Sequence, residues 1–451
     1  VGDCRREHGG TMCPSYMATY EEKHSTRGRA RMLFEMMQGQ VLHQGWKSDA
    51  VFDALDLCLS CKGCKGDCPV NVDMATYKAE FLSHYYEGRP RPRYAYAMGL
   101  IYWWARLASL APGAVNFVTQ MPVVSNLLKA AGGIAQRRKM PEFAPQTFKE
   151  WYRRRGPLKI DKPEVILWPD TFTNHFKPRA GQAAVEVLEN AGFRVRLPGK
   201  SLCCGRPLFD YGFLDTAERL LRDVLEALAP AIRRGTVVVG LEPSCVAVFR
   251  DELPNLFPEN QDAKRLSNQT FTLAEFLTGR VENYSPPRLE RKAVVHQHCH
   301  HKSVLKTDAD KDLYSRMGLA ATVLDSGCCG MAGSFGYEPH KYDLSMHCGE
   351  SVLLPAVREA SKDTIIMTDG FSCRSQIEDA TRRRGLHIAQ VLEMALHEGA
   401  SGPRGAYPER GYTEPYVIDG EGHRGTIAFA AGAGLAAAGA IWALQRRNGN
   451  R

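Results

Sequence analysis

The cysteines between Cys58 and Cys68 have a spacing typical of iron–sulfur binding. The run Cys58-Leu-Ser-Cys61-Lys-Gly-Cys64-Lys-Gly-Asp-Cys68-Pro69 follows C-x2-C-x2-C-x3-C-P, the bacterial ferredoxin pattern that holds a [4Fe–4S] cluster through thiolates. We expect Gly63 and Gly66 to let the backbone turn tightly around the cluster, because a residue without Cβ adopts positive φ at little cost. The alternative is a zinc knuckle or a disulfide pair, since C-x2-C also occurs in zinc sites. Four cysteines in this frame, followed by proline, favour the cluster.

A second motif lies upstream. Cys13-Pro14 has the same ending as Cys68-Pro69, and in two-cluster ferredoxins the fourth cysteine binds the neighbouring cluster. Cys13 is therefore predicted to complete the cluster of the first three cysteines of the run, while Cys4 and Cys68 share the other. The second set has too few ligands, so we expect the sequence to begin inside a motif of a longer polypeptide.

Helices are expected to position these cysteine loops. Residues 24–37 have a helical pattern with Ser25 or Thr26 placed to cap it, and residues 50–57 and 73–86 form two further helical segments. The expectation for residues 1–90 is an all-helical, two-cluster ferredoxin-like domain.

Residues 91–162 have a different composition. Residues 94–135 are rich in aromatic and small residues, but Arg106, Lys129 and the pair Pro112-Gly113 interrupt them, so one helix of the roughly 20 residues needed to cross a bilayer is disfavoured. A buried or interfacial helical hairpin is expected instead of a membrane span. Residues 136–162, rich in Arg, Lys and Pro, are predicted to be a linker.

An internal repeat follows over residues 163–285 and 286–398. Each copy has a short apolar strand, a helix, a Cys-Cys-Gly segment, a second helix, and a strand that leads into Ser-Cys. The strands are predicted at 164–168, 236–240, 293–296 and 364–367. Strands that alternate with helices predict α/β units with parallel sheets, whose ligands bind at the carboxyl ends of the strands. Cys245 and Cys373 follow such strands. The predicted fold class is thus α plus α/β, with two repeated cysteine-rich domains.

Adjacent cysteines cannot easily pair with each other, but both thiolates can reach one multi-iron cluster. The second copy offers four such residues, and the first offers three with Asp170 near the position that corresponds to Cys299. Whether the first copy holds an incomplete cluster or has lost its metal stays open. The four histidines of the run 296–301 are candidate ligands or proton carriers, and Cys348 is expected to be a core residue. The predicted metal ligands of the two copies are Cys203, Cys204 and Cys245, and Cys299, Cys328, Cys329 and Cys373.

Composition supports this interpretation. The chain has 451 residues, 14 cysteines and a net charge of +8, with too few cysteines for a disulfide scaffold and their grouping typical of metal binding in a reducing compartment. The sequence shows neither a nucleic-acid motif nor a signal-peptide pattern. Basic clusters at 153–155, 233–234 and 382–384 are consistent with an acidic partner, anionic lipid or solvated surface. We predict a cytoplasmic protein, with attachment to the cytoplasmic face of the inner membrane as an open alternative.

Three phrases, at residues 9–19, 61–81 and 327–338, resemble the iron–sulfur half of fused FAD-linked oxidases of the D-2-hydroxyglutarate and D-lactate dehydrogenase (glycolate-oxidase) type. The resemblance covers roughly residues 1–398 and extends more distantly to the glycerol-3-phosphate dehydrogenase iron–sulfur subunit and to heterodisulfide reductase subunits. It implies [4Fe–4S] clusters in this chain and FAD in an upstream dehydrogenase domain. In the heterodisulfide reductase pattern each copy ends in C-x2-C, whereas Glu242 and Gly370 replace the first cysteine of that pair in this sequence. The replacement disfavours a noncubane double cluster.

The predicted function is an electron-transfer module of an FAD-dependent 2-hydroxy-acid dehydrogenase, which passes electrons from reduced flavin to a quinone or a soluble acceptor. One alternative makes the repeat itself catalytic, as a heterodisulfide or quinone reductase at the Cys299 site. Another is a zinc-stabilised interaction module. Lys62 and Lys65 are expected either to raise the potential of the nearby cluster or to face water.

The tail, residues 399–451, differs in composition from the rest of the chain. Residues 401–424, rich in Gly, Pro and charge, are predicted to be linker or disordered. Residues 426–444 carry no charge and are marginally long enough to span a bilayer, although they consist largely of Ala and Gly, which insert weakly. A membrane anchor and a loose Ala-rich helix are the two alternatives for this segment.

Overall fold

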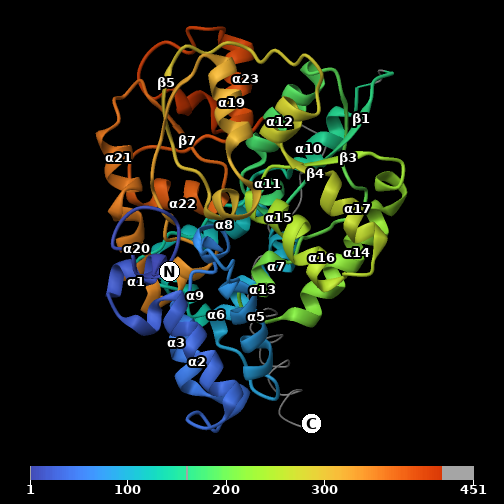
Figure 1. Cartoon of the computed structure of the whole chain (residues 1–451). Helices are drawn as coiled ribbons and strands as arrows, with labels where there is room; N and C mark the ends of the chain where they lie inside the picture. The colour runs from blue at the N-terminus through green and yellow to red at the C-terminus, as the bar shows by residue number, and fades with distance from the viewer. Residues whose placement is uncertain (1, 159–160, 419–451) are drawn as a thin grey trace.

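The helical N-terminal part of the chain lies against two separate parallel β-sheets (Figure 1). The computed structural model describes residues 2–158 and 161–418, so the predicted span at 426–444 lies outside the described residues. In Figure 1 the helical part is blue, the first sheet and its helices are green to yellow, and the second sheet and its helices are orange to red.

Short helices build the cysteine-rich N-terminal part, as expected. The helices predicted at 24–37, 50–57 and 73–86 are confirmed as α2, α3 and α5, and each begins at a side-chain cap: Ser25, Ser48 and Asp73 accept hydrogen bonds from the first turn. The helices of this part are α1 (Pro14–Thr19), α2 (Thr26–Gln38), α3 (Asp49–Asp56), α4 (Gly63–Asp67) and α5 (Met74–Tyr85), with 3-10 turns η1 (Asp3–Arg5), η2 (Glu22–His24) and η3 (Gly45–Lys47).

Residues 91–155 form a series of short helices that joins the helical part to the first sheet. Pro112 and Pro122 each stand at a helix start, because proline has no N–H to donate inside a helix. The helical hairpin predicted over residues 94–135 is found as four short helices, α6 to α9, of which α8 and α9 pack on each other. The linker expected over 136–162 is wrong in part, because α10 buries Phe148 and Trp151 in the core of the first sheet. The helices are α6 (Arg93–Gly99), α7 (Ile101–Ala108), α8 (Pro112–Gln120), α9 (Pro122–Gly132) and α10 (Phe148–Arg155).

The first sheet has the order β2-β1-β3-β4, and all of its pairs are parallel. Its strands β1 (Glu164–Trp168) and β3 (Val237–Gly240) were predicted, whereas β2 (Arg194–Arg196) and β4 (Thr270–Thr272) are too short for the pattern to show. Leu167 and Val239 are fully buried, as expected where helices cover both faces. The helices are α11 (Thr171–His175), α12 (Pro178–Asn190), α13 (Arg206–Phe209), α14 (Leu214–Ile232), α15 (Pro243–Ala247), α16 (Leu253–Leu256), α17 (Gln261–Gln269) and α18 (Leu273–Gly279), with a π-helical turn η4 (Val248–Glu252).

The second sheet has the order β6-β5-β7 and is also parallel. Leu386 adds one further parallel bridge to Met367 at the outer side of β7. The predicted strands are found as β5 (Lys292–Val295) and β7 (Ile365–Met367), and β6 (Ala320–Val323) joins them. The helices are α19 (Asp308–Met317), α20 (Tyr342–Ser351), α21 (Leu353–Glu359), α22 (Phe371–Ala380) and α23 (Ile388–Glu398), with turns η5 (His301–Leu305), η6 (Phe335–Tyr337), η7 (Pro339–Lys341) and η8 (Pro408–Tyr412).

Two pairs of helices connect the sheets. Helix α12, which packs beside the first sheet, contacts α23 beside the second sheet. Helix α18 beside the first sheet likewise contacts α19 beside the second. The described part of the tail also packs here: Glu409 is buried and pairs with Arg383 (2.6 Å). The expectation that the tail from residue 401 is a free linker is therefore wrong for residues 401–418. Among residues 2–158 and 161–418, no helix has the length and apolar character needed to cross a bilayer.

The α12–α23 contact contains a buried ion pair whose disruption should weaken the whole fold. Two Arg179 nitrogens reach the two Glu393 oxygens (2.6 and 2.5 Å), and the two side chains are at most 2% exposed. We predict that Arg179→Ala lowers the free energy of unfolding by about 3–5 kcal/mol, because it leaves a buried carboxylate unpaired. The double variant Arg179→Met/Glu393→Met should regain most of the lost free energy of unfolding, measured by denaturant unfolding. If the single and the double variant lose equal amounts, the unpaired charge is not the cause.

Candidate iron–sulfur sites

The loop from Cys58 to Cys64 is held in an unusual backbone conformation. Ser60 (φ 50°) and Lys62 (φ 57°) have positive φ, a conformation that costs free energy outside glycine and occurs mainly where the surrounding structure demands it. Gly63 and Gly66 lie instead in α4, so the expectation that they supply positive φ is wrong. They are needed for close approach: a Cβ on Gly63 would lie 2.6 Å from the Thr11 carbonyl oxygen, and one on Gly66 would lie 2.9 Å from Ser303 Cα.

Cys13 lies directly before α1, with positive φ of its own (54°). Its sulfur contacts the backbone nitrogen (3.0 Å) and the hydroxyl (2.9 Å) of Thr26, while the Cys64 sulfur accepts a hydrogen bond from the Met74 nitrogen (3.4 Å). Hydrogen bonds to sulfur stabilise the thiolate and tune the potential of a bound cluster. Cysteine spacing could not indicate the Thr26 and Met74 contacts, because they depend on how α2 and α5 pack.

The predicted ligands of this part other than Cys61 gather in one buried cluster. Cys4, Cys13, Cys58 and Cys64 belong to it, with Cys68 half-buried against it. Burial raises the pKa of Cys13 to about 11 and that of Cys64 to about 12, so without metal these thiols stay protonated at neutral pH and iron must displace their protons.

Lys62 does not face water. Its side chain is fully buried and its ammonium group lies 3.0 Å from Asp73, 2.5 Å from Asp251 and 3.1 Å from Glu252. Although burial opposes the charge, these carboxylates raise the pKa of Lys62 above its usual value. The pairing offsets the positive charge beside the cysteine loop and attaches this loop to η4 of the first sheet.

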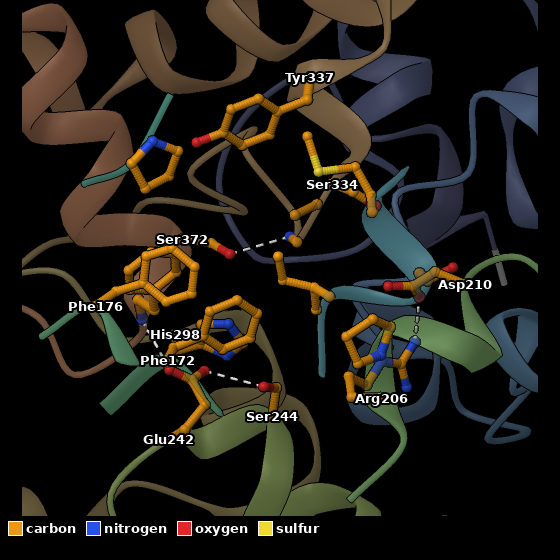
Figure 2. A pocket seen from close by; sticks show the side chains of 18 of the residues that line it. Phe172, Phe176, Arg206, Asp210, Glu242, Ser244, His298, Ser334, Tyr337 and Ser372 are labelled. Atoms are coloured by element: carbon orange, nitrogen blue, oxygen red, sulfur yellow. Dashed lines mark hydrogen bonds and ion pairs between the residues drawn. The ribbon is translucent and has the colours of Figure 1, made fainter. Parts of the chain in front are cut away.

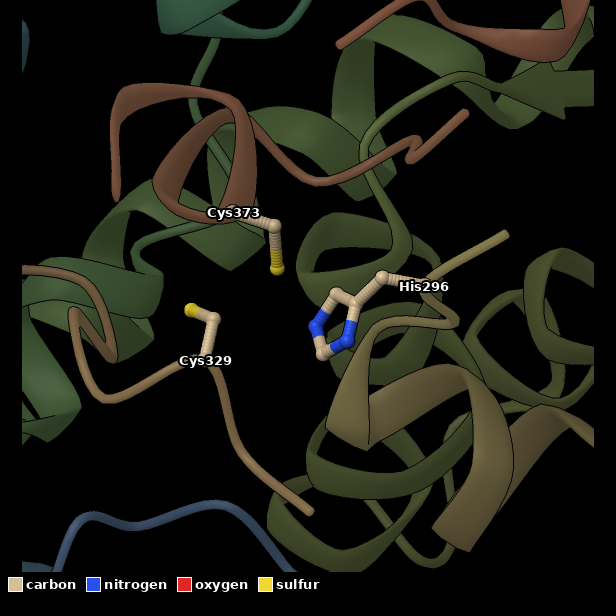
Figure 3. A group of neighbouring side chains, drawn as sticks. All are labelled: His296, Cys329 and Cys373. Carbon is tan, nitrogen blue, oxygen red and sulfur yellow. The ribbon is translucent and has the colours of Figure 1, made fainter. Parts of the chain in front are cut away.

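Four cysteines and one histidine converge beside the second sheet. Cys373 lies in α22 directly after β7, as the prediction for the carboxyl end of a strand requires, and His296 follows β5. The ligand atoms of His296, Cys329 and Cys373 lie within 4.8 Å of one another, and Figure 3 shows all three side chains pointing to a common centre. Cys299, Cys328, Cys329 and Cys373 are each at most 5% exposed.

The four histidines of the run have different surroundings. His296 Nδ1 is hydrogen-bonded to Ser326 Oγ (2.7 Å), and its buried Nε2 has no hydrogen-bond partner among the described residues, as expected for a nitrogen reserved for a metal. His300 Nε2 is hydrogen-bonded to the Ser60 carbonyl (2.9 Å). His301 forms an ion pair with Asp310 (2.9 Å), and His298 lines a cavity between the cysteine loop and the two sheets.

Glu242 and Gly370, which stand where the longer motif has cysteines, each make a close contact of their own. A Cβ on Gly370 would lie 2.4 Å from His298 Cδ2, so any larger residue would displace that imidazole. The Glu242 carboxylate accepts a hydrogen bond from the Phe371 nitrogen (2.8 Å) and thereby connects the ends of the two sheets.

The site beside the first sheet is smaller and more acidic. Cys203, Cys204 and Cys245 are buried, with 2.8 Å between the sulfurs of Cys204 and Cys245. Asp170 lies directly after β1, and its Oδ1 caps α11 while its buried Oδ2 has no hydrogen-bond partner among the described residues. Burial, followed by repulsion from Glu242, raises the pKa of Asp170 to about 6.

The cysteine loop of the helical part meets the second-sheet site directly. Cys61 packs in the same buried cluster as Cys299 and Cys373, and the pKa of Cys61 is raised first by burial and then by the charge of Cys299. The hydrogen bond from His300 to the Ser60 carbonyl and the contact of α4 with η5 hold the loops together. Sequence spacing alone could not show this contact, since about 240 residues separate its two sides.

These donor sets fit iron–sulfur clusters. Buried thiols in groups, an imidazole nitrogen without another partner and loops held by positive φ are features of a metal-binding environment. Among the described cysteines none forms a disulfide. Cys348 is buried in α20, in the same cluster as the second-sheet cysteines, and is not one of the predicted ligands.

Two family models match the helical part and the first cysteine-rich segment of the chain. Residues 2–73 match the family model described as a 4Fe-4S dicluster domain, and residues 171–250 match the one described as a cysteine-rich domain. The chain is 32% identical to the C subunit of anaerobic glycerol-3-phosphate dehydrogenase of Escherichia coli K12, in an alignment that covers 62% of this chain and 72% of the relative. The predicted [4Fe–4S] chemistry and the predicted resemblance are thereby confirmed.

Two further relatives extend the comparison. The chain is 27% identical to D-2-hydroxyglutarate dehydrogenase of Pseudomonas putida KT2440, over 84% of this chain and 41% of the relative. It is also 30% identical to lactate utilization protein A of Bacillus licheniformis, over 51% of this chain and 98% of the relative.

Single cysteine-to-serine substitutions test the second-sheet donor set, which consists of Cys299, Cys328, Cys329 and Cys373 with His296. We predict that Cys373→Ser lowers iron and acid-labile sulfide in anaerobically purified protein, because a thiolate ligand is lost. Cys348→Ser, an equally buried exchange outside the donor set, should leave both unchanged. Equal metal content in the two variants would show that Cys373 is not a ligand.

Proposed function

Since the chain belongs to the family of the anaerobic glycerol-3-phosphate dehydrogenase C subunit, an iron–sulfur electron-transfer family, we propose that it serves a flavin-dependent 2-hydroxy-acid dehydrogenase. The observation that carries the proposal is the packing of Cys61 of the ferredoxin-type loop in the same buried cluster as Cys299 of the second-sheet site, with His300 hydrogen-bonded to the Ser60 carbonyl between them. It supplies a continuous buried path between two candidate clusters. Oxidation of a 2-hydroxy acid releases two electrons to the flavin, and [4Fe–4S] clusters, when bound, carry electrons singly.

We assign the cysteines to separate centres. Cys13, Cys58, Cys61 and Cys64 would hold one cluster, and Cys4 and Cys68 would contribute to its neighbour. Cys299, Cys328, Cys329 and Cys373, with His296 beside them, would hold a further centre. Cys203, Cys204 and Cys245 would hold a metal only with a fourth donor, for which the buried Oδ2 of Asp170 is the candidate.

We also infer that residues 163–285 and 286–398 are copies of one module. The first sheet has the order β2-β1-β3-β4, and the second has the order β6-β5-β7. The two orders agree when the segment at Leu386, which forms a parallel bridge to β7, is taken as the counterpart of β4. Both outer elements lead into a helix with a capping box, Thr272 with Glu275 and His387 with Gln390. The reciprocal packing of α12 on α23 and of α18 on α19 is what a pseudo-two-fold axis between two copies produces.

The flavin belongs, in this proposal, to a separate dehydrogenase domain or subunit. The chain spans 41% of the length of the D-2-hydroxyglutarate dehydrogenase that it matches. The rest of such a protein has room for an FAD-binding domain.

Electron entry is tested with photoreduced flavin as donor. We expect anaerobically purified protein to lose visible absorbance and to develop a paramagnetic resonance signal as it accepts electrons. Cys64→Ser lacks one ligand of the cluster assigned to Cys13, Cys58, Cys61 and Cys64. In this variant, reduction of the second-sheet centre by flavin should fall to background, while the iron content of that centre stays unchanged. Zinc in place of iron, with no resonance signal after dithionite, would instead identify an interaction module.

We further propose that this protein associates with an anionic membrane surface through helices α7 to α9. Between Glu87 and Glu142 the sequence has no acidic residue, and the exposed basic residues of this stretch are Arg89, Arg93, Arg106, Arg137 and Lys139. Leu107, Leu110, Phe117, Val123 and Leu127 on or next to these helices are between 52% and 78% exposed. Apolar side chains flanked by basic ones are typical of interfacial helices.

Vesicle binding tests this surface. Phe117→Asp should weaken sedimentation with phosphatidylglycerol vesicles about tenfold, since burial of a phenylalanine contributes about 1.5–3 kcal/mol. Met37→Asp exchanges a residue that is 77% exposed on α2, outside this surface, and should leave binding unchanged. Equal binding of both variants, or wild-type binding only to neutral vesicles, would refute the proposed surface.

A further inference from the structure

A second group of side chains that could bind a metal lies beside the second-sheet donor set and shares no member with it. His301 begins η5, Asp310 lies in the first turn of α19, and Asp369 stands between β7 and α22. One ligand atom from each of these side chains lies within 4.8 Å of the other two. Three separate segments around the second sheet therefore converge on one point. We call these three residues the His301 group.

The His301 group surrounds a small buried cavity. His301 and Asp310 are 2% and 1% exposed, and Asp369 is half-buried. Together with Tyr314 and Thr368 they line a cavity of about 10 Å³, which is about the volume of one water-sized sphere. A cavity of this size accommodates a single ion but no organic ligand.

His301 differs from the other histidines of its run. His296 belongs to the second-sheet donor set (Figure 3), His298 lines the larger cavity drawn in Figure 2, and His300 contacts the ferredoxin-type loop. His296 and His298 also reach the wall of the small cavity. The His301 group is thus a direct neighbour of the iron–sulfur ligands that we assign to the second sheet.

The two carboxylates of the His301 group have no strongly cationic partner. Among the ion pairs of the described residues, Asp310 has only His301 (2.9 Å) and Asp369 has only His387 (3.6 Å). His387 Nδ1 accepts a hydrogen bond from the Ala389 nitrogen (3.0 Å), so it carries no proton there and its imidazole is neutral. Two carboxylates therefore share at most one charged imidazole. Since buried charges in proteins are paired or coordinate metals, the remaining negative charge favours a bound cation.

The geometry of the group fits two ligands of one ion. Although His301 Nε2 and Asp310 Oδ2 lie 2.9 Å apart, neither atom has a suitably directed hydrogen-bond partner among the described residues. Two ligand atoms that each lie about 2.0–2.2 Å from a cation are about 3 Å apart when their bonds are nearly perpendicular. The buried Thr368 hydroxyl at this cavity also lacks a partner in the described part of the chain.

An outer contact orients the third carboxylate-bearing segment. Asp369 Oδ1 accepts a hydrogen bond from the Ile388 nitrogen (2.9 Å), which fixes the carboxylate at the end of β7. Hydrogen bonds of this kind hold metal-binding carboxylates in position.

We propose that His301, Asp310 and Asp369 bind one divalent cation of the manganese-to-zinc series, separate from the iron–sulfur centres. Imidazole suits zinc and iron, and carboxylates suit manganese, so the mixed set suits a first-row divalent ion. The cation would join η5, α19 and the end of β7. Because His301 follows Cys299 closely and Asp369 precedes Cys373 closely in the sequence, the cation would also fix the segments that carry these two cysteines.

Mn²⁺ binding to the anaerobically purified, cluster-loaded full chain tests the site. The probe is the paramagnetic resonance signal of free Mn²⁺ at room temperature, where iron–sulfur clusters are silent because their electron spins relax too fast. Wild-type protein should take up a single Mn²⁺ per chain, and Zn²⁺ should displace it, because nitrogen and oxygen sites bind zinc more tightly. Mn²⁺ also avoids thiolates, so the cysteine sites do not compete.

Substitutions on two different segments identify the ligands. Asp310→Asn and Asp369→Asn should each weaken Mn²⁺ binding about tenfold or more, the loss that even an outer contact of a metal site typically causes. The control is Asp379→Asn, since the Asp379 side chain is 14% exposed and that of Asp369 is 16% exposed; it should bind as wild type does. Samples are matched for iron content. Equal affinity in all of these proteins, or uptake that does not saturate, would overturn the site.

A second measurement uses the wild-type protein alone and does not depend on how the variants fold. Saturating Mn²⁺ should raise its unfolding temperature, because a ligand that binds only the native state stabilises that state. An unchanged unfolding temperature would overturn the proposed site. It would leave the proposed electron transfer intact, because that function is measured at the cysteine centres by their reduction with flavin.

Discussion

The structure depends on the burial of many sulfur atoms in a few small volumes. Burial raises the pKa of Cys13 to about 11 and that of Cys64 to about 12, so these two thiols remain protonated until a cation shares the charge of the thiolate. The cysteine loops have little regular secondary structure of their own and include residues at positive φ. Metal binding and folding of these loops are therefore coupled.

Three parts of the chain meet at this sulfur-rich region, and each contact has a distinct physical origin. The buried Lys62 ammonium ties the ferredoxin-type loop to carboxylates of the first sheet. Close backbone approach at Gly66 and the hydrogen bond between His300 and Ser60 tie it to the second. Glu242 connects the ends of the two sheets.

If residues 163–285 and 286–398 are copies of one module, as we infer, their sheets share a topology but differ in the side chains that could bind metal. The first ends in three cysteines with Asp170 and Glu242 nearby, and the second ends in four cysteines with His296. Carboxylates are hard, anionic donors, whereas thiolates and imidazole suit iron–sulfur chemistry better. Only the second site lies against Cys61, which is consistent with electron transfer through that copy.

The sequence by itself determined the local features: the cysteine motifs, three capped helices of the N-terminal part, the buried strands such as Glu164–Trp168, and the parallel α/β class. These follow from short-range rules of spacing, capping and apolar pattern. It misplaced what depends on packing. Gly63 and Gly66 serve close approach and not positive φ, Lys62 is buried, and α10 replaces part of a linker. Residues 401–418 pack on both sheet regions, through Glu409 with Arg383 and through Tyr416 with Arg179.

Only the tertiary structure decided which cysteines meet. The shared buried cluster of Cys61 and Cys299, the hydrogen bond between His296 and Ser326, and the stacking of Phe172 on Phe371 join residues far apart in the chain. Such contacts are set by how whole helices and sheets pack, because burial free energy depends on total surface and not on sequence neighbours. Spacing could therefore name the candidate ligands, whereas only the packing of helices and sheets could bring the second donor set next to the first.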